Sequence, residues 1–223
     1  MDLYASVPSG AGPFPAVVVA HPASGVGEFT QSIADRLAAE GYAAVAPNRF
    51  HRVTEEMLAS GSAAGQFLND LETIADMNAT VDFLRNHPAI DGERIGIIGF
   101  CSGGRIAWLS AATNPHLKAA VPYYGGNIMA TVGEATGSPF DLAEGISCPV
   151  LFHFGEVDTN PSQDDMRRFD AELTRLGKEH DFRSYPGAGH AFMDQSQAAR
   201  YHEAAAQASW PVTVEFFATH LKV

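Results

Sequence analysis

Residues Ile95 to Arg105 read Ile-Gly-Ile-Ile-Gly-Phe-Cys-Ser-Gly-Gly-Arg and indicate the fold of the chain. Its first half is an apolar segment of strand length, and its second half is a Gly-x-Cys-x-Gly-Gly turn. This order is typical of a nucleophile elbow, in which a reactive side chain stands on a tight turn between a strand and a helix. Small residues must surround such a turn because its backbone is strained. We therefore predict a strand, a turn at Cys101 and a following helix.

Cys101 takes the position that serine occupies in most such turns. The following helix would point its N-terminal amides at the thiol, which lowers the thiol pKa and favours the reactive thiolate. The alternative is an inert cysteine buried at the end of a strand, the usual fate of a free cysteine. Glycines at Gly99, Gly103 and Gly104 favour the nucleophile.

Outward from this turn, apolar runs of strand length alternate with longer segments of helical period. Such alternation predicts a doubly wound α/β fold, with a mostly parallel sheet and helices on both faces, in a single domain over residues 1–223. Strands are expected at 16–20, 42–46, 95–100, 119–124, 150–154 and 182–185. Helices are expected at 29–41, 71–87, 102–112, 166–177 and 195–221, the last kinked or divided at Pro211. Residues 48–66 are expected to form an irregular functional loop.

Composition narrows the classes of partner. A formal net charge of −12 argues against nucleic acid and anionic membranes, since both select basic surfaces. No apolar run is long enough to span a bilayer, and the first residues lack the pattern of a secretory signal. Cys101 and Cys148 make neither a disulfide framework nor a metal-ligand spacing. We expect a cytoplasmic monomer or small homo-oligomer that acts on a small molecule.

A thiol nucleophile needs a base, and the base needs an acid that orients it. In this fold the chain order is nucleophile, acid, histidine, each on a loop after a strand. Asp158 follows the strand expected at 150–154, and His190 follows the strand that ends at Tyr185. Asp158 could instead be a turn residue, and Glu156 is the nearest rival for the acid.

The remaining histidines show no i, i+4 spacing with a nearby carboxylate, so we expect no metal and no cofactor. His153 is expected to be a buried, hydrogen-bonded core residue, and His21 a structural neighbour of the site. Cys148 is expected to be structural.

An oxyanion hole needs two backbone amides. We assign one to Ser102, directly after the nucleophile. The second should come from the loop after the strand at 16–20. Pro22 has no amide hydrogen, so Ala23 is the expected donor.

With these residues in place, the chain resembles the dienelactone hydrolase family of α/β-hydrolases over nearly its whole length. The resemblance lies in the segment Ala34–Tyr42, the Gly-Phe-Cys-Ser-Gly-Gly elbow, the Gly-Ala-Gly-His loop and the aromatic residues of the last helix. It implies the α/β-hydrolase fold and a Cys-His-Asp triad that hydrolyses an ester or lactone through an acyl-enzyme without a cofactor. The implied triad is Cys101, Asp158 and His190.

The chain departs from the pattern of well-studied members at positions that bear on the substrate. Those members carry a glutamate where this chain has Pro22, and that glutamate couples thiol ionisation to substrate binding. They also hold the substrate carboxylate with two arginines. One of these positions is Asp194 here, and the loop 60–69, which would hold the other, contains no basic residue. The N-terminus also lacks a strand that the family usually has.

We therefore hypothesise a neutral or weakly polar ester, thioester or lactone as substrate. Loss of a bidentate charged anchor would weaken the binding of a carboxylate by several kcal/mol. Arg49, Arg52 or Arg105 could substitute for the missing arginines. The candidate apolar wall of the substrate site consists of Phe50, Tyr123, Tyr124 and Phe192.

Two other functions are compatible with a protein of this fold. One is a catalytically weak ligand-binding or interaction module on a hydrolase scaffold, since fold alone does not establish activity. The other is a thiol redox protein that uses both cysteines. The absence of a Cys-x-x-Cys pair argues against the redox function.

Overall fold

A computed structural model of the protein describes residues 1–59 and 63–222. The strands are β1 (Leu3–Ser6), β2 (Phe14–Ala20), β3 (Ala43–Pro47), β4 (Ile90–Phe100), β5 (Leu117–Tyr123), β6 (Val150–Gly155) and β7 (His180–Tyr185). The α-helices are α1 (Glu28–Ala39), α2 (Glu55–Leu58), α3 (Asp70–Arg85), α4 (Ser102–Thr113), α5 (Gln163–Arg175) and α6 (Glu203–Leu221). The described residues also form two short 3-10 helices, η1 (Ala64–Phe67) and η2 (Ala143–Gly145).

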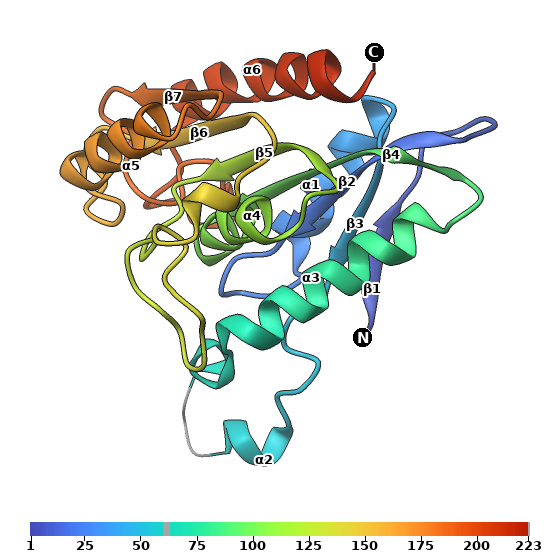
Figure 1. The fold of residues 1–223 in the computed structure, drawn as a ribbon, viewed down its shortest axis with the longest axis horizontal. Coiled ribbons are helices and arrows are strands. Elements are labelled where there is room, and N and C mark those ends of the chain that lie inside the picture. Colours follow the sequence, from blue (N-terminus) through green and yellow to red (C-terminus); the bar gives the residue numbers. More distant parts are fainter. Residues whose placement is uncertain (60–62, 223) are drawn as a thin grey trace.

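The strands form one twisted sheet in the order β1-β3-β2-β4-β5-β6-β7 (Figure 1). All neighbouring pairs are parallel except β1 and β3, which are antiparallel. The strand order reverses direction from β2 to β4, the switch point at which ligands bind in open α/β sheets. The loops that leave the carboxyl ends of β2 to β7 therefore gather at one edge of the sheet.

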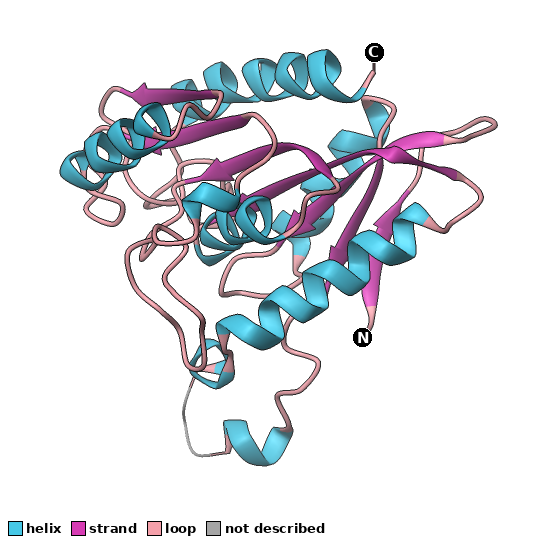
Figure 2. Ribbon diagram, in the orientation of Figure 1, coloured by secondary structure: helices cyan, strands magenta, loops and turns pink. Residues whose placement is uncertain are grey.

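Helices cover both faces of the sheet, as the alternation of the sequence predicts (Figure 2). Residues of β2 alternate between two apolar cores. Val18 belongs to the core that contains side chains of α3, α4 and α5, whereas Val17 and Val19 belong to the core that contains those of α1 and α6. Because both faces of the strand are buried, its sequence is a continuous apolar run rather than an alternating one. The doubly wound α/β fold is thus confirmed.

Two parts of the chain differ from expectation at the N-terminal end and in the long loop. Residues 3–6 form an edge strand that was not predicted, because four residues with half their side chains exposed are too few to show a strand pattern. Residues 48–66, expected to be irregular, contain the short helix α2 and the start of η1. Residues 60–62 of this expected loop lie outside the described residues.

Two helices also differ in detail. The last helix begins at Glu203 rather than near residue 195, and it runs through Pro211 without being divided. On α3, Leu71 recurs at helical spacing with Val81 and Leu84, which are buried, yet Leu71 itself is 40% exposed. Beside its apolar residues, the buried face of α3 carries Asp70 and Asp76, which accept hydrogen bonds from arginine side chains. Apolar periodicity alone cannot detect a helix face that is buried by ion pairs.

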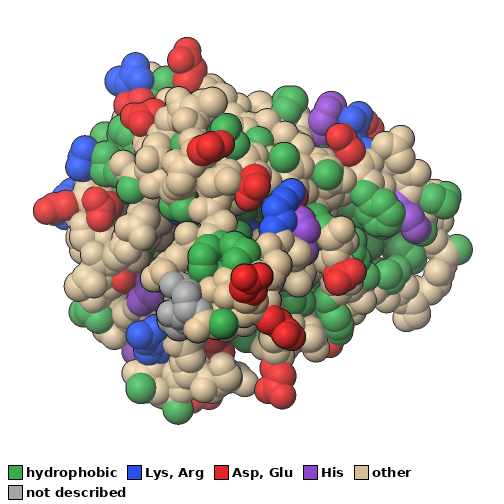
Figure 3. Space-filling model, turned by 90° about the horizontal axis from the view of Figure 1, so that it is seen from below, with side chains coloured by type: hydrophobic (Ala, Val, Ile, Leu, Met, Phe, Trp, Pro, Cys, Tyr) green, Lys and Arg blue, Asp and Glu red, His purple; other side chains and the backbone are tan. Residues whose placement is uncertain are grey.

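The surface reflects the acidic composition. On the face shown in Figure 3, basic side chains of the described residues are interspersed with acidic ones and do not gather into a broad patch. None of the helices in the described part of the chain combines the length and the apolar character needed to cross a bilayer.

Candidate active site

Cys101 lies on the tight turn between the end of β4 and the start of α4. Its φ of 57° falls in the left-handed region that favours glycine, so the turn is strained. The surrounding glycines let neighbouring backbones approach closely. A Cβ on Gly99 would lie 1.9 Å from the carbonyl oxygen of Gly103, and a Cβ on Gly103 would lie 1.9 Å from that of Ala20. Neither position can hold a larger residue without moving backbone.

His190 and Asp158 meet on the loops that follow β7 and β6. Nδ1 of His190 lies 3.0 Å from Oδ2 of Asp158, whose side chain is 2% exposed. The other oxygen of Asp158 accepts a hydrogen bond from the amide of Asn160. Glu156, the rival for the acid, is exposed and accepts from the amide of Gly187 instead. Since Nδ1 faces the carboxylate, Nε2 is the nitrogen of His190 left for the thiol.

Two backbone amides face the sulfur of Cys101. They belong to Ser102, at the start of α4, and to Ala23, in the loop after β2. Both lower the pKa of the Cys101 thiol, because an amide N–H directed at the sulfur favours its ionised form. The same two amides are those expected to form an oxyanion hole, and this arrangement can stabilise negative charge beside the sulfur.

The charges in the site favour a thiolate next to an imidazolium. Burial raises the pKa of the Cys101 thiol, but the contact with His190 and the two amides outweigh it and lower the pKa below its usual value. Burial likewise opposes protonation of His190, but Asp158 and Cys101 outweigh it and raise the pKa of His190 to about 9. Each group thus stabilises the charged form of the other.

Two cavities meet at Cys101. The smaller cavity, of about 210 Å³, extends toward the loop after β3 and is lined by Arg49 and Phe50 among others. The second cavity, of about 310 Å³, lies on the side of Tyr124. Both are lined by Cys101 and His190. A carbonyl group held at the sulfur could therefore place its two substituents in separate cavities.

The four aromatic residues expected to line the substrate site divide into two pairs. Phe50 lines the smaller cavity, and Tyr124 lines the second with its ring 5.2 Å from that of His190. Tyr123 and Phe192 are fully buried and line neither cavity. Their expected contact with substrate is corrected: both belong to the core between the sheet and α6.

The three arginines left open as substrate anchors lie in different environments. Arg52 pairs with Asp76 on α3 and lines neither cavity. Arg105 lines the smaller cavity, but Asp70 holds its guanidinium through two hydrogen bonds of 2.6 and 2.8 Å. Arg49 also lines this cavity and is 3% exposed. Sequence reasoning missed Asp70, for which the only signal was an acid in the first turn of a helix.

Asp194 borders the second cavity, and its carboxylate is already engaged. It accepts hydrogen bonds from the amide and hydroxyl of Ser196 and from the side chain of Gln197. The residue is 4% exposed. The carboxylate shapes the loop after His190 and adds negative character to that side of the site.

His153 and Cys148 both lie in the interior of the protein. His153 is a buried core residue as expected, 2.7 Å from the hydroxyl of Tyr185 and 3.0 Å from that of Thr213. Cys148 is buried, and burial raises its thiol pKa to about 12. Within residues 1–59 and 63–222, no three His, Cys, Asp or Glu side chains are grouped so that they could hold a metal ion.

The parallel sheet, the elbow after β4, and the acid and histidine after β6 and β7 define an α/β-hydrolase. The chain belongs to the dienelactone hydrolase family, which matches residues 1–221. Family membership indicates a hydrolase that acts on ester or lactone bonds.

Individual relatives agree with this assignment. A Salmonella typhimurium protein named "putative carboxymethylenebutenolidase" is 35% identical over 224 residues, covering 97% of this chain and 82% of its own. A Synechocystis protein of the same name is 32% identical over 227 residues, with 98% and 92% covered. The crystal structure of a "putative dienelactone hydrolase" from Klebsiella pneumoniae superposes with a TM-score of 0.84 at 34% identity, covering 97% of this chain and 92% of that one.

Proposed function

We propose that the protein is a cysteine-dependent carboxylic ester or lactone hydrolase that works through an acyl-enzyme. Cys101 is the nucleophile, His190 the general acid and base, and Asp158 the residue that orients His190. The observation that supports this most is the contact of His190 with Asp158 through Nδ1, which leaves Nε2 for the sulfur. We further propose that one domain, residues 1–223, carries the whole site.

In the first half of the reaction, the thiolate of Cys101 attacks the carbonyl carbon and forms a C–S bond. The electron pair displaced onto the carbonyl oxygen accepts hydrogen bonds from the amides of Ser102 and Ala23. When the tetrahedral intermediate collapses, the C–O bond to the alcohol breaks. His190 donates its Nε2 proton to the departing oxygen.

In the second half, His190 is neutral and acts as a base. It takes a proton from water, and the hydroxide attacks the thioester carbon. The same two amides stabilise the second oxyanion. Collapse releases the acid product and returns Cys101 to its thiolate and His190 to its protonated form. Asp158 keeps the imidazole in the tautomer that both halves require.

We propose a neutral small ester or lactone as the substrate. Asp194 borders the second cavity and disfavours an anionic group there. In the smaller cavity, Arg105 is already neutralised by Asp70, and Arg49 is held by the carbonyl oxygen of His21 and the hydroxyl of Ser102. Faster hydrolysis of the anionic dienelactone than of neutral short-chain aryl esters would contradict this proposal.

Turnover of p-nitrophenyl acetate tests the nucleophile. We expect Cys101→Ala to lower kcat/KM by at least about 10³-fold. Cys148→Ala is the matched control and should stay within about twofold of the parent, since the residue lies away from both cavities. Iodoacetamide should inactivate the parent and Cys148→Ala equally. Activity that survives Cys101→Ala would overturn the proposal, and no turnover on a broad ester and lactone panel would favour a ligand-binding module.

A further inference from the structure

Arg49 is a buried cation without a carboxylate partner in the described part of the chain. It is 3% exposed, and its Nε is buried with no hydrogen-bond partner. Nearby arginines differ in this respect, since Arg105 pairs with Asp70 and Arg52 pairs with Asp76. Burial of an uncompensated charge is costly, so a buried cation normally has a counter-charge.

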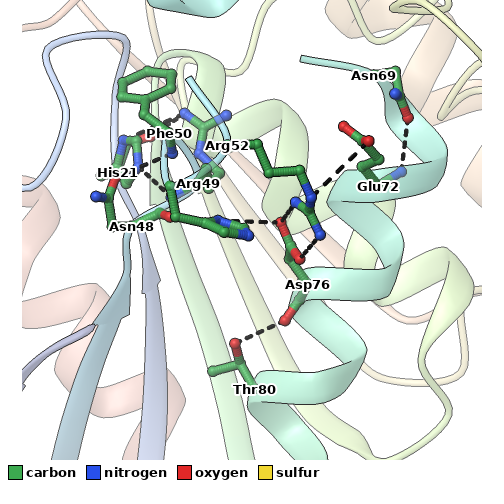
Figure 4. A network of polar contacts seen from close by, with 10 residues as sticks. His21, Asn48, Arg49, Phe50, Arg52, Asn69, Glu72, Asp76 and Thr80 are labelled. Atoms are coloured by element: carbon green, nitrogen blue, oxygen red, sulfur yellow. Dashed lines mark hydrogen bonds and ion pairs between the residues drawn. The ribbon is translucent and has the colours of Figure 1, made fainter. Parts of the chain in front are cut away.

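A polar network holds Arg49 in one place. Its Nη2 donates to the carbonyl oxygen of His21 at 2.7 Å and to the hydroxyl of Ser102 at 3.1 Å. Its backbone amide donates to Nε2 of His21 at 3.1 Å. Figure 4 shows His21, Arg49 and Phe50 in one group, whereas Arg52 reaches across to Asp76 on α3.

His21 is the neutral anchor of this network. Since the Arg49 amide donates to Nε2, the ring proton must sit on Nδ1, which lies 2.7 Å from the carbonyl oxygen of Pro22. Burial and the charge of Arg49 lower the pKa of His21 to about 3, so it adds no charge. His21 thereby ties Arg49 to the Pro22–Ala23 loop, whose Ala23 amide faces the sulfur of Cys101.

The guanidinium of Arg49 lies in the cavity that contains the nucleophile. Arg49, Cys101 and Ser102 line the same space of about 210 Å³, and the Ser102 hydroxyl bridges the guanidinium to the elbow. Burial lowers the pKa of Arg49 to about 10, and the negative charge on Cys101 acts in the opposite direction. Among the described residues, the thiolate is thus a negative charge that acts on this cation from within the same cavity.

The other charges around Cys101 are largely compensated. Asp158 is paired with His190, and Asp194 is held by neutral donors. Arg105 is paired with an aspartate of α3. Arg49 is therefore a cation that lines the smaller cavity without a carboxylate partner among the described residues.

Two further titratable residues line the second cavity beside Cys101, Tyr124 and Arg200, and neither adds an effective charge at the sulfur. Burial raises the pKa of Tyr124 well above its usual value, so it is neutral. Arg200, at the mouth of the second cavity, is exposed, and its charge is screened by solvent.

We propose that Arg49 is a positioning residue that keeps Cys101 ionised in the enzyme before substrate binds. The inference rests on the proposed role of Cys101 as nucleophile. A permanent cation on this loop makes ionisation of the thiol independent of the substrate. The consequence is an enzyme whose resting form is already the thiolate.

The test is a titration of the thiolate absorbance in the substrate-free protein, with Cys101→Ser as the blank. Alkylation by iodoacetamide is followed in parallel, because a neutral reagent is not itself attracted by Arg49. We expect Arg49→Met to raise the thiol pKa by about one unit and to slow alkylation near pH 6 by about tenfold. Arg49→Lys should restore most of the alkylation rate, because it keeps the charge.

Two further variants make the result specific. Arg52→Met removes a cation from the same loop and should leave the titration unchanged, since Arg52 faces Asp76. Ser102→Ala keeps the amide but removes the hydroxyl that holds Arg49, and it should shift the thiol pKa in the same direction by less. If Arg49→Met does not fold, Ser102→Ala and Arg49→Lys still test the proposal.

Several outcomes would overturn the proposal. One is a folded Arg49→Met protein that titrates as the parent does. Another is an equal shift in Arg49→Met and Arg49→Lys, which would indicate packing rather than charge. A third is an unchanged titration with selective loss of p-nitrophenyl hemisuccinate relative to p-nitrophenyl butyrate turnover, which would make Arg49 a substrate anchor. Failure of the proposed function would be seen separately, as turnover that survives Cys101→Ala.

Discussion

His190 is the residue whose charge links the two halves of the proposed reaction. It must be protonated while the alcohol leaves and neutral while water attacks. Its pKa is raised to about 9 because Asp158 and Cys101 outweigh the effect of burial. A raised pKa means that the proton is held up to that pH and lost above it.

The pH profile of kcat/KM should therefore fall on the alkaline side near pH 9, as His190 loses its proton. Asp158→Asn removes a charge that raises the pKa of His190, so the alkaline limb should move to lower pH. We expect kcat to drop by about 10²–10⁴-fold at the same time, because the imidazole loses its orienting partner. An alkaline limb that stays in place in Asp158→Asn would contradict this assignment.

At the scale of elements, the elbow depends on how closely α4 approaches β2. Gly103→Ala would place a Cβ 1.9 Å from the carbonyl oxygen of Ala20, a backbone atom that cannot rotate away. We expect a loss of at least about 2 kcal/mol in the free energy of unfolding, measured by denaturant titration. Gly65→Ala, where a Cβ meets no atom within 4 Å, should change it by less than about 0.5 kcal/mol. Equal effects of the two substitutions would contradict the close-approach argument.

The buried pair Asp70–Arg105 joins α3 to α4 and to the loop after β5. Arg105 also donates to the carbonyl oxygens of Asn127 and Ala130, and Asp70 accepts from the amide of Val132. Asp70→Asn leaves a buried guanidinium unpaired.

The free energy of unfolding should therefore fall by about 3–5 kcal/mol in Asp70→Asn. Glu172→Gln, which breaks an exposed pair with Arg175 on α5, should leave it almost unchanged. Comparable midpoints of urea unfolding for the two variants would show that the Asp70–Arg105 pair contributes little.

Some elements could be predicted from the sequence because their signal is local. The continuous apolar run of β2 indicates a strand that is buried on both faces. The glycines around Cys101 indicate a turn that is too crowded for larger residues. The buried face of α3 could not be predicted, because its polarity is explained only by arginines from the loop after β3 and from α4. Tyr123 was misplaced for a similar reason, since it lies at the carboxyl end of a strand where core and site adjoin.

At the scale of the whole molecule, the loops after β2 to β7 bring distant residues to one edge of the sheet. The order Cys101, Asp158, His190 could be predicted from chain order and turn residues. The environment of Arg49 could not, because it depends on a hydrogen bond to His21, 28 positions earlier in the chain. Contacts between residues of different loops produce no periodic pattern in a single sequence.

The two buried histidines predict that acid destabilises the fold. Burial lowers the pKa of His21 and of His153 to about 3, whereas both titrate near 6.5 when unfolded. Below about pH 6 the unfolded state therefore binds more protons, and each histidine costs about 1.4 kcal/mol per pH unit.

His153→Gln should accordingly reduce the pH dependence of the unfolding free energy between about pH 6 and pH 4 by about that slope. His87→Gln, at an exposed position, serves as the control and should leave the dependence unchanged. Parallel curves for the parent and His153→Gln would contradict the assignment.

The site of acylation shows directly whether Cys101 is the nucleophile. The protein is mixed with p-nitrophenyl acetate, quenched in acid within the first turnovers, digested and analysed by mass spectrometry. We expect one acetyl group on the peptide that contains Cys101, on the sulfur, and none in Cys101→Ala. An acetyl group on Ser102 or elsewhere that forms and decays at the rate of turnover would contradict it, as would steady turnover with no acylated protein.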